Sequence, residues 1–280
     1  MKIFRLKKEM GQYLADCKKA GKTIGFVPTL GALHDGHISL VKKAARSNDI
    51  TVVSIFVNPR QFNQPSDFEK YPRTIAADIK LLVEGKCDVL YLPDVNDVYR
   101  GHKDVHPNLH GLELQLEGAF RPGHFDGVVQ VVYALLQAVT PNQLYMGLKD
   151  FQQQAIIQRM ISELNMDVQL IPVPTLREKN GLARSSRNVR LTPQQRNDAG
   201  IIYQTLQDIR DQLKLGITLN QALNKANKTL SKIPNTKLEY ILACDPITLN
   251  TVKKYTLGQP LVILIAIWWG DVRLIDNIIL

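Results

Sequence analysis

Two periods of apolar residues alternate along the chain, and their order predicts the fold. Short continuous apolar runs, typical of buried parallel strands, lie between stretches with apolar residues at i, i+3 and i+4, typical of helices. The expected strands are residues 23–27, 50–57, 88–92, 143–146 and 168–173. The expected helices are residues 7–20, 38–46, 74–85, 127–138 and 151–165. This order predicts an α/β fold, a doubly wound parallel sheet that binds ligands at the carboxyl ends of its strands.

The pattern changes after about residue 176. Long helical periodicity covers residues 192–215 and 219–232, and strand-like runs cover residues 239–244 and 261–269. This mixture is typical of a separate α+β arrangement. We therefore expect a larger domain over residues 1–176 and a smaller α+β C-terminal domain over residues 177–280 that closes over the first.

Composition narrows the class to a globular protein of the cytoplasm. Of the 280 residues, 45% are hydrophobic and 22% are charged, as in ordinary folded proteins. The longest apolar run, residues 261–269, is far shorter than the roughly 20 residues that cross a bilayer. Charges interrupt the N-terminal stretch where a signal peptide needs an apolar run. Cys17, Cys87 and Cys244 are odd in number and far apart, which argues against a disulfide framework or a zinc site. We expect no membrane contact and a cytoplasmic location.

The net charge of +9 favours anionic ligands. Lys and Arg are spread along the chain in runs no longer than two, whereas a dedicated nucleic-acid surface clusters them. Small anions are therefore the preferred ligands, with no nucleic-acid partner expected.

A bend rich in Pro and Gly, residues 28–37, separates the strand at 23–27 from the next helix. This order places His34 and His37 at or beside a helix N-terminus, where unpaired N–H groups and the helix dipole favour an anion. Gly36 allows the main chain to approach a phosphate closely, and both imidazoles are able to donate hydrogen bonds to it. Metal ligation is the rival role, but no further His, Cys or acidic cluster nearby completes a coordination shell.

Polar side chains also follow the strand at residues 50–57. Asn58, Arg60 and Gln61 should emerge at the same carboxyl edge as the histidines. A neutral glutamine amide suits the hydroxyls or carboxylate of a small polar substrate. A merely solvated side chain at a strand end is the equally weighted alternative.

The segment of residues 118–127 holds three glycines and a proline around Arg121 and His124, directly before an apolar helix. Arg121 suits an anionic ligand, and His124 suits a structural role. An ordinary long surface loop is the competing interpretation.

A second strand-to-helix junction contains Gly147, Leu148, Lys149 and Asp150. Lysine pairs with phosphate as a point charge, and the aspartate suits Mg²⁺ or a ribose hydroxyl. Because glycine before a charged pair is common in ordinary turns, this signal alone is weak.

A basic, hydroxyl-rich segment lies just beyond the expected domain boundary. Arg184, Ser185, Ser186 and Arg187 combine guanidinium forks with hydroxyl donors, which suits a loop that grips a triphosphate. A merely solvated basic loop is the alternative.

In this order, these segments resemble the pantoate-beta-alanine ligase family. The matching motifs are residues 29–37, 57–62, 71–73, 117–125, 149–153, 181–188 and 266–277. The resemblance implies a Rossmann-like nucleotidyltransferase domain that binds nucleotide and pantoate, a C-terminal lid associated with the dimer, and a homodimer. It also implies two chemical steps: pantoate and ATP give pantoyl adenylate and pyrophosphate, and β-alanine then displaces AMP. ATP with Mg²⁺ is then a substrate, and no tightly bound cofactor is expected.

The resemblance also assigns residues by position. His37 is the implied proton donor, with His34 beside it and Lys149 as a further catalytic residue. Gln61 and Gln153 are implied to hold pantoate, with Gln61 also near β-alanine, and we expect Asn58 and Arg121 to assist them. The implied ATP site comprises Leu30, Gly31, Ala32, Leu33, His34, Asp35, Gly36, His37, Gly147, Leu148, Lys149, Asp150, Leu176, Arg184, Ser185, Ser186 and Arg187.

Three positions depart from the family pattern. Leu30 stands where Met is frequent, Leu148 where a charged residue is common, and Arg184 where an apolar residue or Lys is seen. We expect activity to survive, with nucleotide affinity the quantity most affected. Two other functions fit part of the sequence: a nucleotidyltransferase without the amide-forming step, and a basic RNA-binding module. Neither accounts for Gln61 and Gln153 at their spacing from the other motifs.

Overall fold

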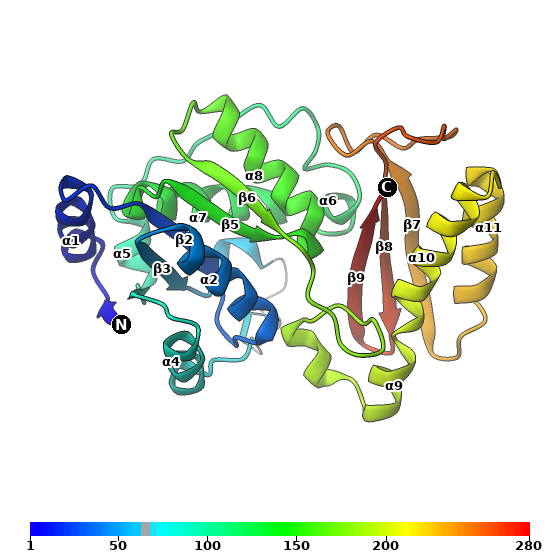
Figure 1. Cartoon of the computed structure of the whole chain (residues 1–280), viewed down its shortest axis with the longest axis horizontal. Coiled ribbons are helices and arrows are strands. Elements are labelled where there is room, and N and C mark those ends of the chain that lie inside the picture. The colour runs from blue at the N-terminus through cyan, green and yellow to red at the C-terminus, as the bar shows by residue number, and fades with distance from the viewer. Residues whose placement is uncertain (63–67, 70) are drawn as a thin grey trace. The chain divides into compact units, whose positions relative to one another are not determined.

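A computed structural model describes residues 1–62, 68, 69 and 71–280. The chain divides into two compact units, each considered by itself. Unit 1 comprises Met1–Leu148 and Gln152–Pro174, and unit 2 comprises Lys149–Phe151 and Thr175–Leu280. Figure 1 labels most of the helices and strands of both units.

Unit 1 contains a parallel sheet of six strands. They are β1 (Lys2–Phe4), β2 (Ile24–Thr29), β3 (Ile50–Ile55), β4 (Val89–Tyr91), β5 (Gln143–Gly147) and β6 (Gln169–Val173). The order is β1-β4-β3-β2-β5-β6, and every pairing is parallel. The chain runs outward from β2 to β3 on one side and later to β5 on the other, so the topological switch point lies at β2 and β5. The predicted doubly wound sheet is confirmed.

Helices cover this sheet because both faces of its central strands are apolar. Val27 and Val53 share a core cluster with Val41 of α2, whereas the alternate position Phe26 is buried on the opposite face. Figure 1 shows α2 in front of the strands, and α7 also packs on β2. The helical segments are α1 (Lys7–Lys19), α2 (Asp35–Ser47), η1 (Pro59–Gln61), α4 (Ile75–Glu84), α5 (Val95–Tyr99), α6 (Glu117–Phe120), α7 (His124–Val139), η2 (Leu148–Asp150) and α8 (Phe151–Glu163).

Unit 2 is an antiparallel sheet with helices packed against it. Its strands are β7 (Thr236–Cys244), β8 (Val262–Trp269) and β9 (Val272–Ile279), in the order β7-β8-β9. Its helical segments are η3 (Ser186–Arg190), α9 (Pro193–Asp198), α10 (Ile201–Lys214) and α11 (Leu219–Leu230). Leu206 of α10, Ala222 of α11 and Ile265 of β8 belong to one buried cluster. The predicted smaller α+β arrangement is confirmed.

The structure also corrects some expected elements. The single helix predicted over residues 192–215 is wrong, because α9 and α10 are separate. A Cβ on Gly200 would lie 2.5 Å from the carbonyl oxygen of Asn180, so the chain passes too closely there for a larger residue. Strands β1 and β9 were not predicted. Helix α2 begins at Asp35 rather than at Ile38, since His34 caps it.

In the described part of the chain, no helix has both the length and the apolar character that a membrane crossing requires.

Candidate active site

The carboxyl ends of three adjacent strands in unit 1 carry predicted site residues. Strand β2 pairs with both β3 and β5. His34 and His37 follow β2, Gln61 follows β3, and Gly147 ends β5. Because the strands are parallel and adjacent, these residues share one edge of the sheet at its switch point.

The turn between β2 and α2 has an unusual main-chain conformation. Gly31 and Ala32 have φ angles of 85° and 49°. Both lie in the left-handed region, which residues other than glycine rarely adopt. The N–H of Gly31 donates to Thr29 Oγ1 at 3.2 Å, and the N–H groups of Ala32 and Leu33 donate to the carboxylate of Asp78. These N–H groups are thus used within the turn rather than offered to a ligand.

His34 and His37 cap α2 reciprocally. His34 Nδ1 accepts from the N–H of Gly36 at 3.1 Å, and His37 Nδ1 accepts from the N–H of His34 at 3.3 Å. Their ring centroids lie 4.0 Å apart. Since a main-chain N–H only donates, each neutral imidazole carries its proton on Nε2. The cap therefore makes both Nε2 atoms hydrogen-bond donors, as a phosphate site requires.

The turn after β3 is organised by Asn58, which is fully buried. Its Nδ2 donates to Gln61 Oε1 at 3.2 Å and to the carbonyl oxygen of Gly127 at 3.1 Å. Its Oδ1 accepts from the Tyr99 hydroxyl at 2.8 Å and from the N–H of Arg60 at 3.2 Å. Four bonds satisfy the amide, so Asn58 orients Gln61, whose Nε2 becomes the group suited to donate to a ligand.

The first turn of α7 contacts the turn after β3. His124 is 6% exposed, and its Nδ1 lies 2.8 Å from the carbonyl oxygen of Gln61. Its Nε2 lies 3.0 Å from Arg121 Nη1. A carbonyl only accepts and a guanidinium only donates, so His124 is neutral with its proton on Nδ1. These contacts agree with the structural role predicted for His124, and they tie Arg121 to the Gln61 turn.

Gly127 approaches this turn too closely for any side chain. A Cβ at this position would lie 2.1 Å from the carbonyl oxygen of Arg60 and 2.7 Å from the N–H nitrogen of Gln61. Such separations do not occur between real atoms, so glycine is required where α7 packs on η1.

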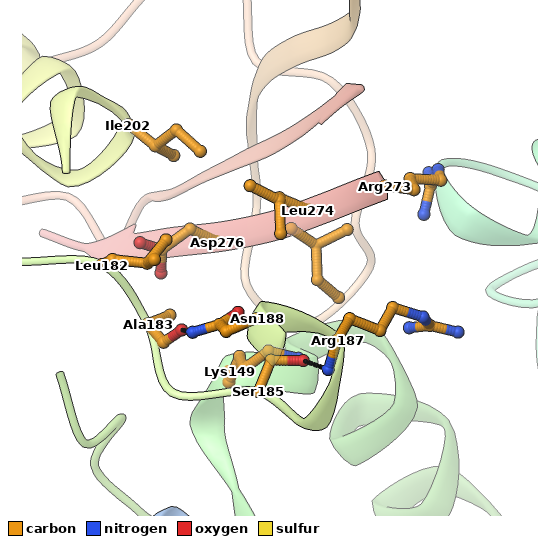
Figure 2. A pocket seen from close by; sticks show the side chains of 11 residues that line it. Lys149, Leu182, Ala183, Ser185, Arg187, Asn188, Ile202, Arg273, Leu274 and Asp276 are labelled. Carbon is orange, nitrogen blue, oxygen red and sulfur yellow. Dashed lines mark hydrogen bonds between the residues drawn. The ribbon is translucent and has the colours of Figure 1, made fainter. Parts of the chain in front are cut away.

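A second group of predicted residues belongs to unit 2, where Lys149, Ser185 and Arg187 line a small cavity of about 10 Å³, room for about one water-sized sphere. Figure 2 shows Ser185 Oγ accepting from the N–H of Arg187 and Asn188 donating to the carbonyl oxygen of Ala183. The lining residues are Lys149, Leu182, Ala183, Ser185, Arg187, Asn188, Ile202, Arg273, Leu274, Ile275 and Asp276.

Lys149 makes two contacts, one through its main-chain carbonyl and one through its side chain. Asn277 Nδ2 donates to the carbonyl oxygen of Lys149 at 3.0 Å. Lys149 Nζ lies 3.0 Å from Asp150 Oδ1. The adjacent Asp276 makes two hydrogen bonds with Arg177, at 2.6 and 2.9 Å. Burial raises the pKa of Asp276, and Arg177 opposes that shift. Three cationic side chains, Lys149, Arg187 and Arg273, thus border one cavity.

The hairpin before η3 brings Leu176 and Arg184 together. The N–H of Arg184 donates to the carbonyl oxygen of Leu176 at 2.9 Å, and Arg177 and Ala183 form a β-bridge. Glu178 of this hairpin binds Arg196 of α9 at 2.8 Å. The predicted residues at 176 and 184–187 therefore form one local segment.

The predicted residues thus fall into two sets, one in each unit. Gln153 lies half-buried on α8, next to Gln152, which is buried and holds the N–H of Glu117. The set in unit 1 is Leu30, Gly31, Ala32, Leu33, His34, Asp35, Gly36, His37, Asn58, Gln61, Arg121, Gly147, Leu148 and Gln153, and the set in unit 2 is Lys149, Asp150, Leu176, Arg184, Ser185, Ser186 and Arg187.

Within residues 1–62, 68, 69 and 71–280, no three His, Cys, Asp or Glu side chains gather as metal ligands. Asp150 is paired with Lys149.

Sequence reasoning missed four residues that hold the site: Asp78, Tyr99, Gly127 and Asn277. One of them left a signal. Asp78 stands in the apolar stripe of α4, with Ile75, Ile79 and Leu82 at helical spacing, and an acid in such a stripe indicates a buried partner. The others contact residues distant in sequence and leave no local pattern.

A six-stranded doubly wound sheet with polar turns at its switch point defines the class: a doubly wound α/β protein, a class whose ligands bind at the carboxyl ends of the strands. Within this class, the sequence matches the pantoate-beta-alanine ligase family over residues 2–279. The chain belongs to this ligase family.

Relatives agree over nearly the whole length. The chain is 43% identical over 279 residues to a pantothenate synthetase of Azobacteroides pseudotrichonymphae, with 99% of each chain covered. A crystal structure of pantothenate synthetase from Thermus thermophilus superposes with a TM-score of 0.90 at 36% identity, covering 99% of each chain. A pantoate-beta-alanine ligase from Francisella tularensis, solved in complex with beta-gamma ATP and beta-alanine, gives a TM-score of 0.79 at 39% identity, covering 99% of this chain and 97% of that one.

Proposed function

We propose that this protein joins pantoate to β-alanine at the expense of ATP, releasing AMP and pyrophosphate in pantothenate biosynthesis. The observation that supports it is the pair of turns at the ends of β2 and β3. One presents two imidazole Nε2–H donors at a helix N-terminus, and the other presents an oriented glutamine amide. The imidazole donors suit the phosphates of ATP, and the glutamine amide suits a polar substrate. Together, these two kinds of donor suit an enzyme that activates a carboxylate.

The first step forms pantoyl adenylate. A carboxylate oxygen of pantoate attacks the α-phosphorus of ATP, and the bond to the β-phosphate bridging oxygen breaks as pyrophosphate leaves. Both reactants are anions, so positioning and charge compensation dominate the catalysis. His37, through its Nε2–H, is the proposed proton donor, with His34 beside it, and Lys149 compensates phosphate charge.

The second step forms the amide. The amine nitrogen of β-alanine attacks the acyl carbon, the bond to the adenylate oxygen breaks, and AMP leaves while the amine loses a proton. Gln61 and Gln153 are the proposed pantoate-binding residues, and Gln61 also lies near β-alanine. Asn58 orients Gln61, and Arg121 supplies positive charge near the same turn.

The proposed nucleotide site consists of residues 30–37, 147–150, 176 and 184–187. ATP enters with Mg²⁺, which keeps several waters and binds mainly through substrate phosphates. Asp150 is the candidate to assist it. Leu148 removes a charge that relatives often have near the phosphates, and Arg184 restores one.

The assembly is also proposed. We assign residues 1–176 to the nucleotide- and pantoate-binding domain and residues 177–280 to a lid associated with a homodimer, in a cytoplasmic enzyme. Analytical ultracentrifugation tests the dimer.

Limited proteolysis tests the lid. Residues 185–187 should become less sensitive to protease when ATP and pantoate are added, and equal sensitivity with and without them would argue against the lid.

Pyrophosphate release tests the function directly. With ATP and pantoate, the protein should release about one equivalent of pyrophosphate quickly, because the adenylate is held. Addition of β-alanine should give continuous turnover with equal amounts of AMP and pantothenate. Pyrophosphate release in the absence of pantoate would instead indicate a nucleotidyltransferase without the amide-forming step.

A further inference from the structure

A buried carboxylate lies under the turn that carries the two histidines. Asp78 of α4 is 1% exposed. Burying a charge is costly unless hydrogen bonds compensate it. Asp78 Oδ1 accepts from the N–H of Leu33 at 2.8 Å and from the Thr74 hydroxyl at 3.0 Å, and Oδ2 accepts from the N–H of Ala32 at 3.1 Å.

These bonds act on the most unusual part of the turn. Two successive N–H groups converge on one carboxylate only when the chain between them turns sharply, and Ala32 has a φ of 49°. An alanine in the left-handed region is strained and persists only where its surroundings enforce it. Asp78 supplies that enforcement through both of its oxygens.

Gly31 shows how closely the carboxylate is placed. A Cβ at Gly31 would lie 3.3 Å from Asp78 Oδ2 and 3.0 Å from Ile55 Cγ2. The glycine, which also has a φ of 85°, therefore lets the turn settle against the acid. The next residue whose position depends on this turn is His34, the N-cap of α2.

We propose that Asp78 is a positioning residue for adenylate formation. It fixes the main chain of Ala32 and Leu33, which sets where His34 begins the reciprocal cap and where both Nε2–H donors lie. Asp78 acts through this turn and not on the substrate. The proposal rests on the proposed function, because it takes residues 30–37 as part of the ATP site.

The first test is Asp78→Asn, which keeps the size of the side chain but replaces one acceptor oxygen with a donor. One of the two main-chain N–H groups then faces an N–H group, and the turn relaxes. We expect the KM for ATP to rise and the rate of adenylate formation to fall, together by roughly tenfold to a hundredfold. The KM for β-alanine should stay unchanged. A variant that is folded by circular dichroism and has the wild-type KM for ATP would overturn the proposal.

A matched control is Asp88→Asn. Asp88 also accepts from a main-chain N–H, that of Thr51 at 2.8 Å, but it lies next to β4 at the amino end of the sheet. Its substitution should leave the KM for ATP unchanged. If the KM for ATP rose equally in both variants, the effect of Asp78→Asn would result from a general loss of stability. That result would overturn the proposal.

Rescue gives a readout that stability alone does not move. Glycine adopts the left-handed region without strain, so adding Ala32→Gly to Asp78→Asn should recover part of the ATP affinity. No recovery in a folded double variant would count against the proposal. If Asp78→Asn fails to fold, Thr74→Val removes one bond to the carboxylate and should raise the KM for ATP by a smaller factor. An unchanged KM in that variant would again overturn the proposal.

The two hypotheses fail differently. Wild-type protein that releases no pyrophosphate with ATP and pantoate contradicts the proposed function, whatever the variants do. Active wild type with an Asp78→Asn variant of normal ATP affinity contradicts only the role of Asp78.

Discussion

Two neighbouring turns at one edge of the same sheet are held by opposite means. The turn after β2 is fixed through its main chain: left-handed residues at 31 and 32, N–H groups bound to Asp78, and a cap made by its own histidines. The turn after β3 is fixed through a side chain, the buried amide of Asn58, and through close packing against Gly127. In the first turn, the distant partner Asp78 binds the main chain. In the second turn, the distant partners Gly127 and Tyr99 bind a local side chain, that of Asn58.

This difference has a chemical consequence. The histidines serve the fold and the proposed chemistry at once, because Nδ1 caps the helix while Nε2 carries the donor proton. The Gln61 amide has the same division, because Oε1 accepts from Asn58 and Nε2 is the atom proposed to donate to the substrate. In both turns, a hydrogen bond at one polar atom of a side chain determines that the other polar atom is a donor.

The largest expected effect is that of His37→Ala in the turn after β2. It removes both the proposed donor and the acceptor for the N–H of His34. We expect adenylate formation to fall by about a hundredfold to a thousandfold and stability to fall by about 1 kcal/mol through loss of the cap. Single-turnover pyrophosphate release and thermal unfolding measure the two losses.

His37→Gln separates these two roles. Glutamine three residues after the N-cap is a normal partner in a capping box, so its side-chain oxygen should restore the cap and the melting temperature but not the activity. Near wild-type adenylate formation in this variant would show that His37 serves only the fold.

The next largest effect should come from Gly127→Ala in the support of the second turn. The added methyl would meet the carbonyl oxygen of Arg60 at 2.1 Å, so η1 must shift and carry Gln61 with it. We expect a loss of about 1–3 kcal/mol in stability and a KM for pantoate that rises by about tenfold or more. Denaturant unfolding and steady-state kinetics measure both.

Gly11→Ala is the matched control for that variant. Gly11 lies within α1, and a Cβ there would meet its nearest neighbour, Ala138, only at 4.0 Å. Helix propensity alone favours alanine by about 0.5–1 kcal/mol, so this variant should be stabilised without a change in KM. If Gly127→Ala behaves in the same way, close packing does not hold the second turn.

A smaller effect is expected from Tyr99→Phe. It removes one of the two donors to Asn58 Oδ1 and leaves the other, from Arg60. Burial raises the pKa of Tyr99 to about 12, so the hydroxyl stays protonated and donates throughout the neutral range. We expect a loss of about 0.5–1.5 kcal/mol in stability and a modest rise in the KM for pantoate, measured by unfolding and by initial rates.

Tyr91→Phe provides the comparison. The Tyr91 hydroxyl donates to Asp97 at 2.7 Å, and the side chain is fully buried. This variant should lose at least as much stability with no change in the KM for pantoate. A KM change of equal size in both variants would show that the bond to Asn58 has no specific role.

The smallest effect should be that of Asp104→Asn. Asp104 lies 2.9 Å from Arg60, and the hydrogen bond from Arg60 lowers the pKa of the Asp104 carboxyl. A lowered pKa in the folded state contributes stability above the unfolded pKa, and this contribution is lost as the pH falls through the folded pKa. Because the pair is exposed, we expect a slight fall in melting temperature at pH 7 that vanishes in acid or in high salt. A marked change in the KM for pantoate would mean that charge, rather than Asn58, fixes the second turn.

The sequence predicted the central strands and helices because their apolar periods are clear. It did not predict β1, which has three residues, or β9, whose apolar pattern is interrupted by the buried Asp276 and Asn277. The break between α9 and α10 was missed because it lies where a residue distant in sequence binds the end of α9: Asn180 Nδ2 donates to the carbonyl oxygens of Arg196 and Asn197 at 2.9 and 2.8 Å. Local periodicity does not contain such a contact.

The same distinction applies to the site. His34, His37 and the glycines of their turn are recognisable because they stand together in one short segment of the sequence. The roles of Tyr99 and Gly127 depend on contacts with Asn58, which lies 41 residues from Tyr99 and 69 residues from Gly127 along the chain. The orientation of Gln61 could not be predicted, because the Asn58 amide that sets it is itself held by the distant residues Gly127 and Tyr99.

The bond between Asn277 and the main chain of Lys149 has a consequence for synthesis on the ribosome. Its partners are 128 residues apart, so the lysine leaves the exit tunnel long before its anchor is made. A nascent chain that stalls within unit 2 carries Lys149 without this support. The order of translation therefore delays completion of the lysine's environment until β9 has been added to the sheet.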